Sequence, residues 1–124
     1  MAAAQFSFVG VESEESLAGL RDAAATSHTG ILLLFTAGWC GSCRVVKPVV
    51  ARCMEAAWST GARVPAAVVD VDALPDVASA EKIQELPTIV CFDASGTRTA
   101  YTGSKADKVW GAVRAPSYWR GCTC

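Results

Sequence analysis

Two cysteines that stand three positions apart, Cys40 and Cys43, are the residues of this 124-residue chain with the clearest capacity for chemistry. They lie in the stretch FTAGWCGSCRVVKP, which begins at Phe35 and ends at Pro48. Such a pair can form a reversible disulfide, supply two of the four ligands of a zinc site, or consist of two inert buried thiols. The secondary-structure elements before and after the pair help to decide among these three uses.

A zinc site would need further cysteine or histidine ligands beyond this pair. The sequence holds one histidine, His28, and no second Cys-x-x-Cys, so the remaining ligands would have to include Cys122 and Cys124 near the C-terminus. These residues do not form one of the usual zinc patterns. We therefore expect no metal centre. The cysteine pattern alone still leaves open a zinc site and a pair of inert thiols.

The residues around the pair indicate a buried strand followed by a helix. Residues 31–35 are apolar at every position, which is typical of a strand covered on both faces, as in a central parallel pair. Beyond Cys40, one helical stripe of apolar residues ends near Trp58. Its members are Val46, Val49, Val50, Cys53 and Ala57.

A cysteine pair at the junction of that strand and that helix would be chemically activated. The unpaired backbone N–H groups and the macrodipole at a helix start favour a thiolate over a thiol. Cys40 stands at or just before this start, so we expect its pKa to be lowered and its sulfur to face solvent. Cys43 follows one turn later and can reach a sulfur bonded to Cys40. This placement favours a dithiol/disulfide couple.

The rest of the chain alternates between strand and helix patterns. We expect a short edge strand at residues 5–9, a helix capped by Ser13, a second buried strand at 66–71 and a short helix at 76–84. A third strand at 88–92, its hairpin partner at 97–102 and a final helix at 105–114 follow. This order predicts an α/β fold with a mixed central sheet of four to five strands, flanked by helices on both faces.

Size and charge limit the possible functions. The chain is long enough for one compact domain, and its formal net charge of -1 gives no electrostatic reason to bind nucleic acid. Its N-terminus lacks the pattern of a signal or transit peptide, and its longest apolar run is too short to span a bilayer. We therefore expect a soluble, cytoplasmic protein, monomeric and without nucleic-acid or membrane partners, in a compartment that keeps ordinary thiols reduced.

Three groups of residues together resemble the thioredoxin family. The first is the motif Trp39-Cys-Gly-Ser-Cys43, which continues to Pro48. The second joins Val69-Asp-Val-Asp72 to Leu86-Pro-Thr88, and the third is a hairpin that ends in Tyr101-Thr-Gly103 before the final helix. The resemblance covers residues 6–114 and implies a thioredoxin fold. We expect a thioredoxin-like domain at 1–114 and a C-terminal tail at 115–124 that ends in Cys-x-Cys.

The resemblance implies roles for individual residues. Cys40 would be the nucleophile that attacks a substrate disulfide, and Cys43 would be the thiol that resolves the mixed disulfide. Asp72 would accept a hydrogen bond from the Trp39 indole, unless it is a solvated loop carboxylate. Pro87 would be the family's cis-proline, unless it is a trans proline at a strand start. The active-site segment includes Gly41, Ser42 and Lys47, and the substrate groove would be lined by Trp39, Leu86, Pro87, Gly103 and Ser104.

The chain departs from the family's pattern at two positions. The family commonly has a buried aspartate six residues before the first cysteine, where this chain has Leu34. Water or Lys47 would then have to assist in removing the proton of Cys43, so we expect a slower resolving step but a more stable fold. Ser42 stands where thioredoxins usually have proline, and its hydroxyl should change the reduction potential in a direction that the sequence does not fix. Lys47 could equally be an ordinary surface lysine.

The resemblance further implies a protein-disulfide oxidoreductase that reduces protein substrates through the two cysteines. The alternatives are an oxidant or isomerase on the same fold, and a non-catalytic module that docks a partner protein. We expect no bound cofactor, since the sequence has no glycine-rich dinucleotide motif. Electrons would come from a thioredoxin-reductase-like enzyme or from a low-molecular-weight thiol.

Four cysteines lie outside the motif. Cys53 falls on the apolar stripe and Cys91 within a buried strand, so both are expected to be small core residues. Cys122 and Cys124 could form an accessory dithiol, a lipidation site or an exposed end without a role in function.

Overall fold

The computed structural model describes residues 5–59, 61 and 63–114. The expected tail at 115–124, with Cys122 and Cys124, lies outside these residues. Five strands and four helices follow one another in the described part, in the order that the sequence predicts. They are β1 (Val9–Gly10), α1 (Glu14–Ser27), β2 (Ile31–Thr36), α2 (Gly41–Ser59), β3 (Ala66–Asp70), α3 (Pro75–Ala80), β4 (Thr88–Phe92), β5 (Arg98–Thr102) and α4 (Ala106–Arg114).

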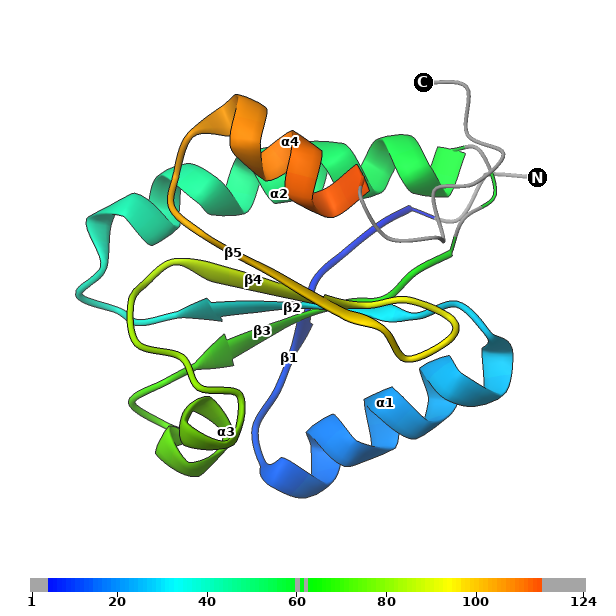
Figure 1. Ribbon diagram of the computed structural model, residues 1–124, viewed down its shortest axis with the longest axis horizontal. Helices are drawn as coiled ribbons and strands as arrows, with labels where there is room; N and C mark the ends of the chain where they lie inside the picture. The colour runs from blue at the N-terminus through cyan, green and yellow to red at the C-terminus, as the bar shows by residue number, and fades with distance from the viewer. Residues whose placement is uncertain (1–4, 60, 62, 115–124) are drawn as a thin grey trace.

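The strands form a single sheet in the order β1-β3-β2-β4-β5. β3 runs parallel to both β1 and β2, whereas β4 is antiparallel to β2 and to β5. Helices α2 and α4 cover one face of this sheet, and α1 and α3 cover the other (Figure 1). The prediction of a mixed sheet between two layers of helices is therefore confirmed.

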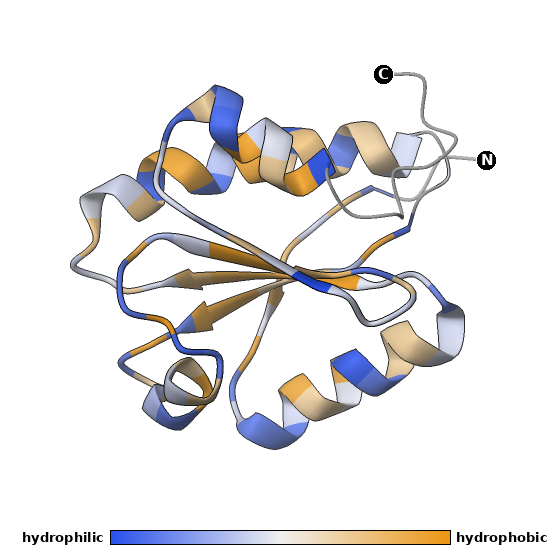
Figure 2. Ribbon diagram, viewed as in Figure 1, coloured by the Kyte–Doolittle hydropathy of each residue, from blue (hydrophilic) through white to orange (hydrophobic). Residues whose placement is uncertain are grey.

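The uniform hydrophobicity of β2 follows from its central place between these layers. Leu32 and Leu34 belong to the core under α2 and α4, whereas Ile31, Leu33 and Phe35 belong to the core under α1 and α3. None of these five side chains is more than 2% exposed, and the central strands β2, β3 and β4 are mostly orange, the hydrophobic colour, in Figure 2. Burying each one stabilises the fold by about 1.5–3 kcal/mol relative to an exposed position.

Helix α1 begins where the sequence places its cap. The hydroxyl of Ser13 accepts a hydrogen bond from the backbone N–H of Ser16 at 3.1 Å, and the Ser16 hydroxyl accepts one from the N–H of Ser13 at 3.1 Å. These bonds satisfy backbone donors at the helix start. Glu14 and Glu15 follow in the first turn, where the helix dipole favours carboxylates.

Two element boundaries differ from prediction by more than one residue. The edge strand is only Val9–Gly10, because the preceding segment makes aromatic contacts instead: the Phe6 ring lies 5.1 Å from that of Phe8 and 5.5 Å from that of Trp58. Helix α3 ends at Ala80 rather than at residue 84, because Lys82 adopts a left-handed conformation with φ of 59°. The segment from 83 to 86 is thereby free to run toward the cysteine motif.

None of the helices in the described ranges is both long and apolar enough to cross a membrane.

Candidate active site

The cysteine motif lies where the chain passes from β2 into α2, at the carboxyl end of two parallel central strands. β2 ends at Thr36, and the N–H of Cys40 donates a hydrogen bond to the carbonyl of Ala37 at 3.1 Å, which closes a turn just before α2 begins at Gly41. Cys40 and Cys43 form a disulfide, with their Cα atoms 5.4 Å apart. The expected strand-to-helix position of the pair is confirmed.

Two donors point at the sulfur of Cys40. The backbone N–H of Cys43 donates to it with an N–S distance of 3.2 Å, and the hydroxyl oxygen of Ser42 lies 3.7 Å away. A disulfide sulfur carries no hydrogen, so the hydroxyl is the donor in this pair. Both donors, together with the dipole of α2, would stabilise a negative charge on Cys40 after reduction. This electrostatic arrangement makes Cys40 the better thiolate of the two cysteines.

The disulfide is nevertheless well covered. Cys40 is 5% exposed and Cys43 is 4% exposed, because Ala37, Val71 and Leu86 pack around them. The expectation that the sulfur of Cys40 faces solvent is therefore wrong for the disulfide form. Trp39 differs sharply from its neighbours, with 71% of its surface exposed beside the covered sulfurs.

A carboxylate in the connection after β3 binds the indole of Trp39. Its Nε1–H donates to Oδ2 of Asp72 at 2.9 Å, so Asp72 is not merely a solvated loop residue. Asp70, which the sequence reasoning did not single out, shapes this turn. Its Oδ1 accepts hydrogen bonds from the N–H groups of Asp72 at 2.8 Å and Ala73 at 3.3 Å. An Asp that ends a strand and precedes a turn is the signal that could have revealed it.

A second segment approaches the cysteines from β4. The peptide bond between Leu86 and Pro87 is cis, as the resemblance implies, and Leu86 packs against the disulfide cluster. The carbonyl of Pro87 accepts a hydrogen bond from the N–H of Gly103 at 3.1 Å. The φ of Gly103 is 143°, and a Cβ there would collide with the hydroxyl of Tyr101. Gly103 and the half-buried Ser104 thus lie beside the cis-proline segment.

Lys47 contacts an aromatic ring, and Leu34 packs in the core beneath α2. The Lys47 ammonium lies 5.5 Å from the centre of the Phe8 ring, on the exposed side of α2. Leu34 is fully buried in the core that also holds Val46 of α2, and it pairs across the sheet with Val68 and Ile89. Its surroundings are those of an ordinary core leucine.

Cys53 and Cys91 are core residues, as predicted, with exposed fractions of 0% and 1%. Burial raises the pKa of the Cys53 thiol to about 12, although the charges of Arg114 and Arg52 oppose the rise.

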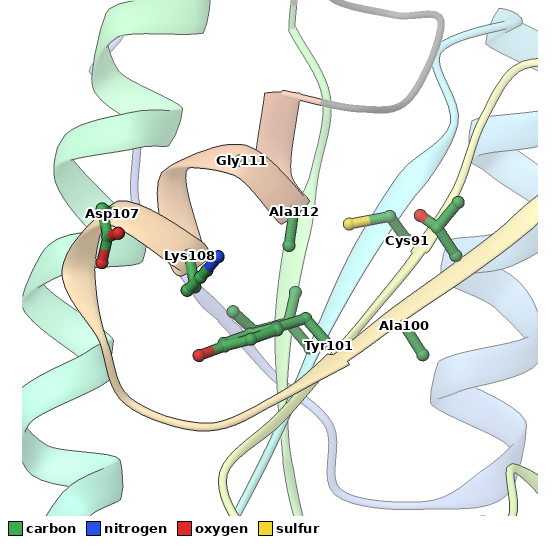
Figure 3. A pocket seen from close by; sticks show the side chains of 9 residues that line it. Cys91, Ala100, Tyr101, Asp107, Lys108, Gly111 and Ala112 are labelled. Carbon is green, nitrogen blue, oxygen red and sulfur yellow. The ribbon is translucent and has the colours of Figure 1, made fainter.

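Cys91 points from β4 toward Ala112 of α4, at the side of a hollow of about 470 Å³ that the Tyr101 ring also borders (Figure 3). The lining of this hollow shares no residue with the cluster around the disulfide.

Comparison with known proteins agrees with this geometry. The sequence profile of the family described as Thioredoxin matches residues 12–114. Thioredoxin 1 of Nostoc sp. is 37% identical over 87 residues, which cover 70% of this chain and 71% of that protein. Thioredoxin-2 of Pyricularia oryzae is 36% identical over 90 residues, which cover 72% of this chain and 45% of that protein. The chain therefore spans about half the length of some curated relatives that it matches.

Solved structures show the same fold. The crystal structure of oxidised thioredoxin O1 from Arabidopsis thaliana matches with a TM-score of 0.70 and 26% identity, covering 86% of this chain and 94% of that one. The matched profile covers the motif, the cis-proline segment and the hairpin in a single continuous range. The chain belongs to the thioredoxin family.

Proposed function

We propose that this protein is a protein-disulfide oxidoreductase of the thioredoxin type, which reduces disulfides in other proteins through Cys40 and Cys43. The observation that carries the proposal is the disulfide at the start of α2, whose first sulfur accepts the N–H of Cys43. A module that only docks a partner would have no need of two bonded cysteines in this position. Membership of the thioredoxin family supports the same activity.

The proposed reaction transfers two electrons to the substrate in two exchange steps. The thiolate of Cys40 attacks one sulfur of a substrate disulfide, the substrate S–S bond breaks, and the departing sulfur takes a proton. The thiolate of Cys43 then attacks the Cys40 sulfur of the mixed disulfide and releases the second substrate thiolate, which is protonated in turn. The substrate ends as a dithiol and the protein as the Cys40–Cys43 disulfide.

The side chains around the couple have roles in this proposal. Trp39, Leu86, Pro87, Gly103 and Ser104 form the surface on which an extended substrate segment lies. Asp72 orients the Trp39 indole through their hydrogen bond. Gly41 and Ser42 form the first turn of α2, and Ser42 donates to the reacting sulfur. The ammonium of Lys47 has the Phe8 ring as a cation–π partner.

The wider setting is part of the same proposal. The protein works as a monomer in the cytoplasm without a bound cofactor. A separate enzyme resembling thioredoxin reductase, or a low-molecular-weight thiol, returns the disulfide to the dithiol. These statements remain predictions from the sequence and from the family.

Reduction of insulin disulfides tests the activity. With dithiothreitol as the electron source, the protein should accelerate the precipitation of the insulin B chain, and Cys40→Ser should abolish the acceleration. A folded protein with no effect on insulin, with dithiothreitol and with candidate reductases alike, would favour the docking module instead. Circular dichroism of both proteins serves as the folding control.

A further inference from the structure

The hollow between helix α4 and the strands β4 and β5 has no part in the proposed disulfide exchange. It encloses about 470 Å³, and none of the residues proposed for the substrate surface lines it. Figure 3 shows the Tyr101 ring on one side of the open space, with Lys108 and Ala112 of α4 on the other. A space of this size beside the core calls for an occupant.

The hollow exists because α4 has small residues where it borders β5. Val109 and Val113 are fully buried against the sheet, whereas Ala112 continues the same helical stripe with a much smaller side chain. Gly111 also lines the hollow, and a Cβ built there would meet no atom within 4 Å in the described structure. A glycine inside a helix lowers its stability relative to alanine, but it lets another segment come close to the helix backbone.

The lining favours an uncharged, largely apolar occupant. On the sheet side it consists of the ring of Tyr101 and the side chains of Ile89 and Cys91, both only 1% exposed. Asp107 and Lys108 lie at the rim, and neither forms an ion pair within the described residues. Their opposite charges offset each other, so the rim selects neither an anion nor a cation. The Lys108 ammonium can, however, lie over the face of an aromatic ring.

The chain that follows α4 contains such a group. Residues 115–124, which lie outside the described ranges, include the adjacent aromatic residues Tyr118 and Trp119 and have no acidic side chain. A cavity of about 150 Å³ holds a benzene molecule in another protein, so the present hollow accepts an indole. A buried indole also needs an acceptor for its N–H. The hydroxyl of Thr99 lines the hollow and forms no hydrogen bond within the described residues.

The connection is long enough for Trp119 to reach the hollow. Ala112 lies two residues before Arg114, where α4 ends, which is about 3 Å along the helix axis. Trp119 follows Arg114 by five residues, and five extended residues span at most about 18 Å. Pro116 and Ser117 lie between them, and both residue types favour a turn. The chain can therefore reverse direction after α4 and return along it.

We propose that the segment after α4 folds back over the helix and places the indole of Trp119 in this hollow, with its N–H directed at the hydroxyl of Thr99. A covalently attached side chain has a high effective concentration there, which favours it over a second copy of the protein. The docked segment stabilises the last turn of α4 and covers the side of β5, the edge strand, that faces this helix. This inference does not depend on the proposed oxidoreductase function.

Nuclear Overhauser contacts locate the indole. In the isotope-labelled full chain, kept in dithiothreitol so that Cys122 and Cys124 do not cross-link copies, the Trp119 indole protons should show contacts with the Ala112 methyl group and the Tyr101 ring. An equimolar mixture of labelled and unlabelled protein, in which only contacts between copies are recorded, should show none of these contacts.

Filling the hollow should displace the indole. Ala112→Phe places a ring in the hollow from the helix side, so the contacts between Trp119 and Tyr101 should disappear. Ala23→Phe is the matched control, because it adds the same ring at an exposed position of α1, on the opposite face of the sheet. It should leave these contacts unchanged. Circular dichroism shows that each variant is folded.

Removing the indole should loosen the end of α4. In Trp119→Ala, the amide hydrogens of the last turn of α4 should exchange about tenfold faster, a factor that corresponds to part of the gain from burying one large apolar side chain. Thr123→Ala changes the same segment outside the docked residue and should keep the wild-type rates. This comparison does not require any substitution in the core.

Several results would overturn the proposal. They are the absence of the contacts in the wild-type chain, their survival in folded Ala112→Phe, and unchanged exchange in Trp119→Ala. Contacts that appear only between copies would place the Trp119 of a second copy in the hollow, and contacts from Tyr118 alone would show the wrong occupant; both contradict the proposal. Reduction of insulin through Cys40 and Cys43 is measured separately, so failure here leaves the oxidoreductase function intact.

Discussion

The backbone N–H of Cys43 donates to the sulfur of Cys40 across 3.2 Å, at the first turn of α2. This bond makes the two cysteines unequal, because only the sulfur of Cys40 receives both an N–H and the hydroxyl of Ser42. In the disulfide, the Cys40 sulfur is a weak acceptor for these donors. After reduction it becomes a thiolate, and hydrogen bonds to a charged acceptor are roughly twice as strong as those between neutral partners.

Alkylation of the reduced protein should therefore label Cys40 first. Its apparent pKa should lie below the value of about 8.5 for a free thiol, because the helix start and the two donors favour the charged form. Rates of iodoacetamide labelling as a function of pH, read by peptide mass spectrometry, give the order of reaction. Faster labelling of Cys43 or Cys53 would contradict the assignment of Cys40 as the nucleophile.

Removal of the Ser42 hydroxyl should make the protein a stronger reductant. The hydroxyl stabilises the Cys40 thiolate, and so the reduced state, more than the disulfide. Ser42→Ala should raise the pKa of Cys40 and make the reduction potential more negative, by up to about 30 mV for a tenfold change in the equilibrium with glutathione. Ser42→Thr keeps a hydroxyl and should stay close to the wild-type potential. A less negative potential for Ser42→Ala would contradict this account.

A carboxylate at position 34 should lower the stability of the fold and accelerate the resolving step. If proton removal from Cys43 limits the resolving step, Leu34→Asp should accelerate that step in stopped-flow experiments near neutral pH. Burial should raise the pKa of the new carboxyl, and the variant should lose on the order of 3 kcal/mol of folding free energy at neutral pH. Below about pH 4, where the unfolded chain also holds this proton, the loss should be smaller.

Leu34→Asn is the matched control, because it adds polarity without a titratable group. It should lower the melting temperature without accelerating the resolving step. If Leu34→Asp folds and resolves no faster than the wild type, the leucine is no handicap, and the proton of Cys43 leaves by another route.

Cys53 should make the protein less stable in base. Its folded pKa of about 12 lies well above the value of about 8.5 for a free thiol. Between these values the unfolded chain releases the proton and the folded chain keeps it, so the free energy of unfolding falls as pH rises, by up to about 1.4 kcal/mol per pH unit. Cys53→Ala should be less stable than wild type near pH 8, and this gap should narrow near pH 10 in urea unfolding of the oxidised proteins. A constant gap would show that the thiol does not contribute.

The fold was largely predictable because its layers impose regular patterns. β2 could be recognised from five apolar residues in a row, since a strand between two helical layers has no polar side. The end of α3 could not be predicted in the same way. Residues 81–84 have no helix breaker, and the helix ends where Nη2 of Arg98, from β5, donates to the carbonyl of Glu81 at 2.8 Å. A contact across 17 positions leaves no local signal.

In the site, too, the features with a local sequence signal were predicted, and those set by distant contacts were not. The spacing and the helix start identify Cys40 and Cys43, because both properties are local. The partner of Trp39 lies 33 positions away, and only resemblance to a family pointed to Asp72. The covering of Cys40 was mispredicted because Val71 and Leu86 reach it from two other connections.

Trapping of the mixed disulfide tests the central claim most directly. Cys43→Ser should attack a substrate disulfide through Cys40 and then stop, because the resolving thiol is absent. Incubation with insulin, followed by non-reducing electrophoresis and mass spectrometry, should show a covalent complex through Cys40 that dithiothreitol releases. Cys40→Ser, at equal concentration, should form little or none. Equal trapping by the two variants, or trapping by Cys40→Ser alone, would contradict the assignment of Cys40 as nucleophile and Cys43 as resolving thiol.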